Sequence, residues 1–179
     1  MPVLPFFLSL AFMALMAQAA IQLPAAAGGI PITGQSLAVL MVGMLLRRPW
    51  PPLAVAVYVL LGALGLPVFA GGRSGWSVLA GGSGGFLFGF IAGAWVVSWL
   101  AGQGWGRRLG RAVAAMAAGT VVILAFGLLR LAMLYGWEKA LEYGLYPFWK
   151  GAIVKIFIGG LAIWLITLWP SSEEKTVRP

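Results

Sequence analysis

The sequence predicts an all-α integral membrane protein with six transmembrane helices and an ordered glycine-rich outer loop between the third and fourth helix. Of its 179 residues, 61% are hydrophobic and only 9% are charged, whereas charged residues make up about a quarter of a soluble domain. The mean hydropathy of +0.97 is correspondingly high. Charges, prolines and glycine clusters divide the chain into six apolar runs, and ~20 apolar residues are enough to cross a bilayer. We therefore expect one six-helix transmembrane domain over residues 1–170 and a polar cytoplasmic tail over residues 171–179.

The first predicted span, Pro2–Leu23, carries small side chains at a regular spacing. Ala11, Ala14 and Ala17 recur at every third position, which places them on a face that drifts slowly around the helix. Small residues let helix backbones approach closely in a membrane. This face is therefore a candidate for contact with a partner helix, and packing within this chain is the alternative.

The second predicted span, Ile30–Leu46, is short for a complete crossing. It reaches across if the helix begins near Ile30, or if the segment Pro31–Gln35 forms a partly unwound start at the outer edge of the membrane. Non-helical backbone at membrane depth is tolerated where it lines a cavity or is buried in protein. Thr33 and Gln35 are thus the first candidates for a binding pocket, and capping of backbone groups is the alternative role for Gln35.

The third and fourth spans, Trp50–Leu66 and Ser83–Leu100, flank the glycine-rich segment Gly65–Phe90. Glycine serves where the chain must take a positive φ or bring its backbone close to another surface. A flexible linker would combine glycine with polar residues, but this segment also contains large apolar side chains such as Phe69 and Trp76. We expect a packed loop that forms the floor and lid of a small-molecule pocket facing out of the membrane.

Glycines also recur along the fourth span itself. Gly81, Gly85, Gly89 and Gly93 follow one another at intervals of four. This is the pattern that lets two transmembrane helices approach closely. Close helix packing is therefore the expected role of this row.

The fifth and sixth spans, Arg111–Tyr135 and Gly151–Trp169, each contain one basic residue, Arg130 and Lys155. A cation at the centre of a bilayer costs about 2.5–3.5 kcal/mol on insertion scales, and neither residue has an obvious carboxylate partner within a span. Each side chain either extends to the membrane interface or faces water, a partner or an anionic group of a ligand. A lone carboxylate is the simplest such group.

The basic residues predict the orientation of the chain. Cytoplasmic loops of membrane proteins carry an excess of Lys and Arg. With six spans, one side of the membrane receives Arg47, Arg48, Arg107, Arg108, Arg111, Lys175 and Arg178. We therefore expect a multi-pass protein of the plasma (inner) membrane with both termini in the cytoplasm and the glycine-rich loop outside.

The composition excludes several classes of function. The chain has no histidine or cysteine and only four acidic residues, which removes most routes to metal binding and nucleophilic catalysis. The net charge of +8 is spread between apolar segments, so it indicates membrane topology rather than nucleic-acid binding. The glycine-rich segment lacks the Lys-Ser/Thr pair of a phosphate-binding loop. We expect a non-enzyme without cofactor or metal, and active transport would need a partner that supplies the energy.

Four segments resemble a known family. PITGQS (residues 31–36), GLPVFAGG (65–72), GGSGGFLFGF (81–90) and YPFWKGAIVK (146–155) are similar to the BioY family, the biotin-binding substrate (S) components of energy-coupling factor (ECF) transporters. The resemblance extends from about Ile30 to Gly160, and the length and the six predicted spans agree with it. It implies a membrane protein that captures external biotin in a pocket closed by the outer loops after the first, third and fifth helices.

The resemblance also implies partners and binding residues. The S component would dock, through the cytoplasmic half of its first helix, on a membrane coupling (T) subunit attached to two ATPases. Lys155 would bind the ligand carboxylate, and Arg130 is the second candidate cation. The other expected contacts are polar groups of Thr33, Gln35 and Ser83, backbone groups of Gly81, Gly84 and Gly85, and apolar walls from Phe69, Trp76 and Phe86.

Two departures from the family pattern concern the ligand. The family's GPTGGY appears as GGSGGF at residues 81–86, and its Pro-Gly-Asp-x-x-Lys appears as residues 150–155 with Ala152 in place of the acid. An aspartate can accept hydrogen bonds from the ureido N–H groups of biotin, and the loss of such a charge-assisted bond costs about 1.5–3 kcal/mol. Three alternatives follow for a binding protein: weaker biotin binding, a substitute acceptor, or another small carboxylate as the ligand. A fourth is a ligand-free structural subunit of a larger membrane complex.

Overall fold

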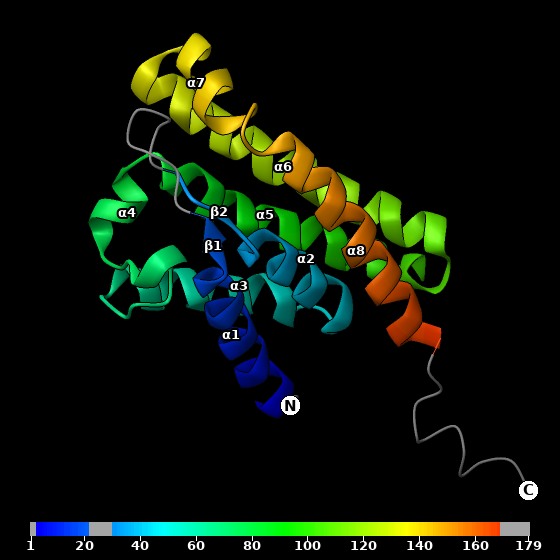
Figure 1. Ribbon diagram of the computed structural model, residues 1–179. Coiled ribbons are helices and arrows are strands. Elements are labelled where there is room, and N and C mark those ends of the chain that lie inside the picture. Colours follow the sequence, from blue (N-terminus) through cyan, green and yellow to red (C-terminus); the bar gives the residue numbers. More distant parts are fainter. Residues whose placement is uncertain (1–2, 22–29, 169–179) are drawn as a thin grey trace, which may run out of the picture.

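The computed structural model describes residues 3–21 and 30–168 and consists mainly of helices (Figure 1). The tail over residues 171–179 lies outside the described residues, as do both ends of the first predicted span. Six longer helices correspond to the six apolar runs: α1 (Val3–Gln18), α2 (Gln35–Leu45), α3 (Trp50–Ala63), α5 (Ser83–Gly102), α6 (Leu109–Tyr135) and α8 (Trp149–Leu168). The connections contain two short helices, α4 (Trp76–Ala80) and α7 (Trp137–Gly144), and two 3-10 turns, η2 (Ala70–Gly72) and η3 (Trp105–Arg107).

The helices differ in their ability to cross a membrane. By length and hydropathy, α5, α6 and α8 can each span one, whereas α1, α2 and α3 are apolar but shorter. With 11 residues, α2 extends only ~16 Å at 1.5 Å per residue, about half of a hydrocarbon core of ~30 Å. A six-span topology therefore stays a prediction.

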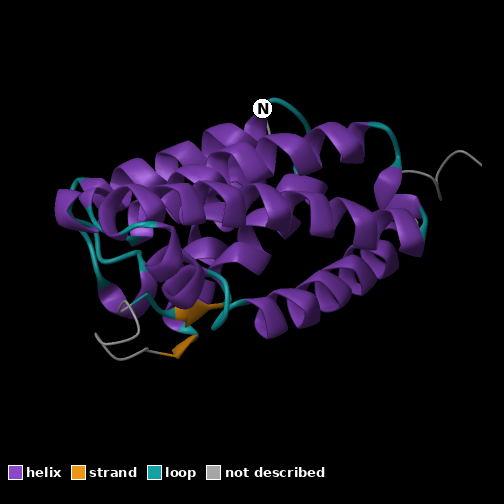
Figure 2. Ribbon diagram, turned by 90° about the horizontal axis from the view of Figure 1, so that it is seen from above, coloured by secondary structure: helices purple, strands orange, loops and turns teal. Residues whose placement is uncertain are grey.

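Ile32 and Thr33, shortly before α2, are extended rather than helical. Strand β2 (Ile32–Thr33) pairs antiparallel with β1 (Ala20–Ile21), with Ala20 opposite Thr33 and Ile21 opposite Ile32. Figure 2 shows these two short strands at the edge of an otherwise helical bundle. The unwound start predicted ahead of Gln35 is thus confirmed, and this small strand pair is an addition to the expected all-helical fold.

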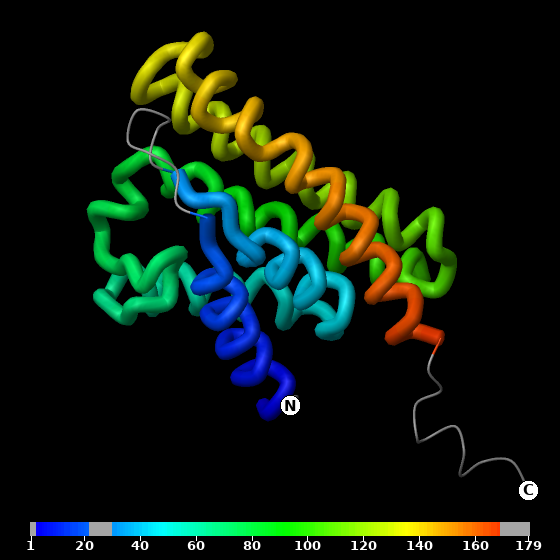
Figure 3. The backbone as a smooth tube through the Cα atoms, viewed as in Figure 1, coloured from blue at the N-terminus to red at the C-terminus, as the bar shows by residue number. Residues whose placement is uncertain are grey.

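Helix α5 packs against α6, α2 and α3, and α6 also packs against α8; Figure 3 follows this course of the chain. The row of glycines on α5 explains the close approach to α6. A Cβ atom on Gly89 would lie 3.0 Å from the Cα and carbonyl oxygen of Ile123, and one on Gly93 would lie 3.2 Å from the carbonyl oxygen of Gly119. The close packing predicted for this row is confirmed at Gly85, Gly89 and Gly93, whereas Gly81 precedes the helix.

The two ends of the bundle have different connections. In Figure 1, α4 and α7 lie at one end, and the α2–α3 and α5–α6 connections lie at the opposite end. Arg47 and Arg48 belong to the first of these connections, and Arg107 and Arg108 to the second. These four of the basic residues expected on one side of the membrane therefore share one end of the described bundle, remote from the glycine-rich segment, whereas Lys175 and Arg178 lie outside the described residues.

The connection between α3 and α5 is a folded structure of its own. It contains η2 and α4, and its backbone turns at Gly71 and Gly72, where φ is 67° and 71°. A residue with a side chain would be strained there. Phe69, just before η2, is 1% exposed and packs against Gly62 of α3. The segment is thus anchored to the bundle at Phe69, whereas Trp76 is exposed; its role as an ordered outer loop stays a prediction.

Candidate ligand-binding site

A cavity lies between the start of α2, the α3–α4 connection and helices α5, α6 and α8. The space between these elements that no protein atom fills is about 820 Å³, with its open mouth and the solvent there included. Its walls are mainly apolar, and these side chains are Ile30, Leu37, Leu40, Phe69, Val78, Phe86, Leu87, Phe90, Met116, Ile123, Leu124 and Phe148. Such a site suits a small ligand with an apolar body and a few polar groups.

Two cations and no acid line this cavity within the described part of the chain. The cations are Arg73, in the α3–α4 connection, and Lys155, on α8. Neither forms an ion pair with a described acidic residue; their hydrogen-bond partners are neutral. No group of three potential metal ligands occurs among the described residues. The electrostatics of the cavity therefore favour a ligand that carries a negative charge.

Lys155 reaches across the cavity to the start of α2. Its Nζ donates to the backbone carbonyl oxygen of Thr33 at 2.8 Å and to Ser36 Oγ at 3.1 Å. An ammonium group has three N–H donors, so one donor is left for a ligand. Ala152 also lines the cavity, one turn before Lys155 on α8.

Gln35 is the first residue of α2 and is 4% exposed. Its backbone N–H, one of the free donors at the start of the helix, donates to Thr33 Oγ1 at 3.2 Å. The side chain of Gln35 has another role, because its Nε2 donates to Tyr58 Oη at 2.7 Å. Tyr58 Oη in turn donates to the carbonyl oxygen of Val68 at 2.6 Å.

Arg73 approaches the cavity at the start of α5. Its Nε donates to the carbonyl oxygen of Ala70 at 3.2 Å, and its Nη2 lies 3.5 Å from Ser83 Oγ. Burial lowers the pKa of the Arg73 guanidinium, but arginine stays protonated in proteins. Arg73 is thus a permanent charge beside the hydroxyl of Ser83.

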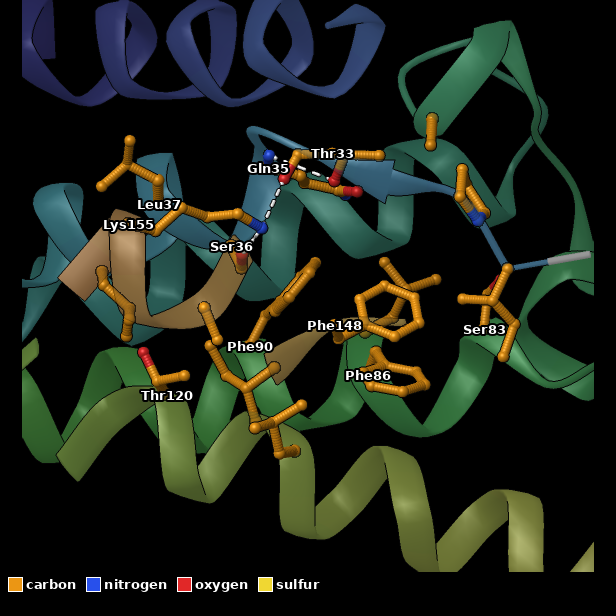
Figure 4. Close-up of a pocket in the computed structure, with 18 of the residues that line it drawn as sticks. Thr33, Gln35, Ser36, Leu37, Ser83, Phe86, Phe90, Thr120, Phe148 and Lys155 are labelled. Carbon is orange, nitrogen blue, oxygen red and sulfur yellow. Dashed lines mark hydrogen bonds between the residues drawn. The ribbon is translucent and has the colours of Figure 1, made fainter. Parts of the chain in front are cut away.

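Figure 4 shows how the polar and apolar groups are distributed. Lys155, Ser36 and Gln35 gather in one part of the cavity, and Ser83 lies at the other side of it. The rings of Phe86 and Phe148 are stacked between them, with centroids 5.7 Å apart and planes at 29°. The cavity therefore has two polar regions, and aromatic rings line the part between them.

Six of the eleven predicted binding residues line the cavity, namely Thr33, Gln35, Phe69, Ser83, Phe86 and Lys155. The other five do not contribute to its described lining. Trp76 is 66% exposed. Gly81 and Gly84 fit against the backbone of α4, and Gly85 fits against α6. Arg130 points to the end of α4, where its Nη2 donates to the carbonyl oxygen of Ala80.

Sequence reasoning missed several residues of the site. Ser36 and Phe148 belong to the PITGQS and YPFWKGAIVK segments, so their motifs contained a usable signal. Arg73 is a single cation in a glycine-rich loop and carries no such signal. Tyr58 is a single hydroxyl in the apolar run of α3, and it is 1% exposed. A buried phenol needs a hydrogen-bond partner, and that requirement was the available signal for Tyr58.

The alanine row of α1 is divided between two environments. Ala11 is exposed, Ala14 is half-buried and Ala17 is fully buried in this chain. Part of the row therefore packs internally, and only its N-terminal part is free for a partner helix. The role of this row in partner contact stays a prediction.

Comparison with known proteins decides the family. The family model described as BioY family matches residues 3–172. The chain belongs to the BioY family. It is 38% identical over 135 residues to the biotin transporter BioY of Thermotoga maritima, covering 75% of this chain and 79% of that one. It is 39% identical over 141 residues to the biotin transporter BioY of Rhizobium etli, covering 74% and 75%.

A solved structure shares the fold. The crystal structure of the S-component for biotin from an ECF-type ABC transporter superposes with a TM-score of 0.77 and covers 96% of this chain and 93% of that chain, at 20% sequence identity. The apolar helices and the BioY relatives together show that the chain is a multi-pass helical membrane protein. Both of these relatives are named as transporters.

Proposed function

We propose that this chain is the biotin-binding S component of an ECF-type transporter and takes up external biotin with high affinity. The observation that carries this proposal is the cavity, which combines aromatic walls and two cations without an acidic lining residue in the described part. Biotin has a matching shape, because an apolar body separates its carboxylate from its ureido group. The names of the BioY relatives support the same ligand.

The geometry favours one orientation of biotin. An arginine presents its donors in a planar fork that matches a carboxylate, and Arg73 lies next to the hydroxyl of Ser83. Lys155 Nζ is a donor, and the Thr33 carbonyl oxygen and Ser36 Oγ beside it are acceptors. This combination suits a ureido group, which both donates and accepts, better than a carboxylate, which only accepts. In this orientation Arg73 binds the carboxylate and Lys155 donates to the ureido oxygen. This differs from the sequence-based expectation, which placed the carboxylate at Lys155.

Transport requires partners. The sequence has no phosphate-binding loop, so a membrane coupling (T) subunit and two ATPases would supply the energy. Residues 1–170 would form the single transmembrane domain. The end of the bundle with Arg47, Arg48, Arg107 and Arg108 would face the cytoplasm, as would both termini, and the mouth of the cavity would open outside the plasma (inner) membrane.

A different small carboxylate is the second candidate ligand, and Ala152 is the observation that favours it. Ala152 lines the cavity without offering a hydrogen-bond acceptor. A ligand with a carboxylate but without N–H groups would not need one. The retained cations argue against the ligand-free structural subunit, because a scaffold gains nothing from unpaired charges beside a cavity.

Uptake of labelled biotin tests the proposal. The chain is expressed with a coupling subunit and ATPases in a host that lacks its own biotin uptake. Energy-dependent accumulation that unlabelled biotin competes away is the expected result. Accumulation equal to that of the host without the chain would reject biotin transport, and competition by another carboxylate alone would favour the second candidate.

A further inference from the structure

Three groups from separate parts of the chain form a short relay behind the cavity. Gln35 Nε2 donates to Tyr58 Oη at 2.7 Å, and Tyr58 Oη donates to the carbonyl oxygen of Val68 at 2.6 Å. Gln35 is 4% exposed and Tyr58 is 1% exposed. Hydrogen bonds between buried groups are strong, and leaving one of these buried groups without its partner costs free energy of folding.

The hydrogen atoms in this relay fix the orientation of the Gln35 amide. A phenol has a single hydrogen, and the carbonyl oxygen of Val68 can only accept. The hydrogen of Tyr58 therefore points to Val68, and the Tyr58 oxygen must accept from Gln35. If the amide were turned over, Gln35 Oε1 would face the Tyr58 oxygen with no hydrogen between them. The relay thus assigns Nε2 to the Tyr58 side and leaves Oε1 on the other side.

Gln35 lines the cavity, and its side-chain oxygen Oε1 is the atom that does not bond to Tyr58. No described residue donates a hydrogen bond to Oε1. Among the described residues, Oε1 is also not one of the fully buried polar atoms that lack a partner. Ala152, which also lines the cavity, supplies no acceptor. We propose that Tyr58 is a positioning residue that holds Gln35 Oε1 toward the ligand, so that Gln35 accepts an N–H group of the biotin ureido ring. This inference rests on the proposed function.

Tyr58 is itself held by the α3–α4 connection, which lines the cavity with Phe69 and Arg73. Its ring contacts the ring of Phe69 edge-on, with centroids 5.9 Å apart and planes at 78°. The backbone N–H of Phe69 donates to the carbonyl oxygen of Arg73 at 3.1 Å. The same segment therefore contacts Tyr58 through Phe69 and carries Arg73, the cation beside Ser83.

The test is calorimetric titration of the full chain in detergent with biotin and with biotin methylated on its ureido nitrogens. Tyr58→Phe keeps the ring and removes the hydroxyl that orients Gln35. We expect it to weaken biotin binding about tenfold and to reduce the preference for biotin over the methylated analogue. Gln35→Met removes the acceptor and keeps a side chain of similar size. In that variant Tyr58 has no acceptor to orient, so adding Tyr58→Phe should change biotin affinity by less than about threefold.

A purely structural role for Tyr58 predicts a different pattern. In that case Tyr58→Phe would weaken both ligands equally, or would cost as much with Met at position 35 as with Gln. Either result, or a Tyr58→Phe protein that binds biotin like the wild type, would overturn the inference. If the wild type binds no biotin, the proposed function fails and the inference fails with it.

A further variant covers the case in which Tyr58→Phe does not fold, which thermal unfolding will show. Gln35→Glu presents an acceptor in either orientation of its carboxylate. It should keep the preference for biotin over the methylated analogue, and Gln35→Met should lose it. Equal preference in these two variants would overturn the role of position 35 as the acceptor.

Discussion

Lys155 Nζ lies 2.8 Å from the backbone carbonyl oxygen of Thr33, a residue 122 positions earlier in the chain. The contact joins α8 to the extended segment before α2. Because the partners of Lys155 are a carbonyl and a hydroxyl, its charge is held in place without being neutralised. A cation fixed in this way can bind a polar or anionic ligand group and release it again.

Replacing Lys155 by alanine should strongly reduce biotin uptake at nanomolar biotin. The change removes a donor that is already oriented in the cavity, and a hydrogen bond to a charged group contributes about 1.5–3 kcal/mol. Affinity should fall by one to two orders of magnitude. Lys150→Ala is the matched control, since Lys150 is exposed on the same helix and its Nζ lies 5.5 Å from the centre of the Trp149 ring. Wild-type uptake with Lys155→Ala would reject its role.

Arg73→Gln should show which of the two polar groups of biotin Arg73 binds. If Arg73 binds the carboxylate, the variant loses about tenfold or more in affinity for biotin and little for the uncharged amide of biotin. Lys155→Ala should weaken both ligands. Arg108→Gln, at the opposite end of the bundle, serves as the control for a change in net charge. The assignment would be wrong if Arg73→Gln weakened the acid and its amide alike.

Ala152→Asp should strengthen biotin binding. The new carboxylate would line the cavity one turn before Lys155, within reach of its ammonium, and would offer a charged acceptor for a ureido N–H. A gain of about tenfold is expected, and Ala152→Leu, which fills space without an acceptor, should give a loss. Unchanged or weaker binding by the aspartate variant would show that the ureido group does not approach Ala152.

Gly85→Ala tests the packing of α5 on α6. A Cβ atom there would meet the backbone of Phe126 and the side chain of Arg130, and overpacking costs about 1–3 kcal/mol. Gly110→Ala is the control, because Gly110 lies in α6 with nothing within 4 Å of its Cβ position. Because Gly110 lies in the first turn of α6 rather than in its middle, that change should stabilise the protein by at most about 0.5–1 kcal/mol. Thermal unfolding in detergent should move in opposite directions for the two variants.

Much of the fold could be predicted from the sequence, because the charges, prolines and glycines that divide the chain lie where the helices end. Lys155 and Gln35 were also predictable, since a polar side chain in an apolar span requires a partner or a cavity. Trp76 shows the limit of this reasoning. Hydrophobicity does not separate the inside of a membrane protein from its lipid-facing surface, and Trp76 is exposed.

Other parts of the site depend on tertiary structure. Arg73 looks like an ordinary loop cation until the α3–α4 connection folds beside Ser83. The role of Tyr58 depends on Val68 and Gln35, which come from two other segments of the chain. Spacing along one helix cannot predict such contacts, whereas the requirement that every buried polar group be satisfied can restrict them.

Calorimetric titration of biotin into the purified protein, with desthiobiotin as the comparison, tests the central claim most directly. Desthiobiotin keeps the carboxylate and the ureido group, so the polar contacts proposed for Arg73, Lys155 and Gln35 should serve both ligands. We predict saturable binding of biotin in the nanomolar range and binding of desthiobiotin within about tenfold of it. The absence of both heat and thermal stabilisation at high micromolar biotin would contradict the account.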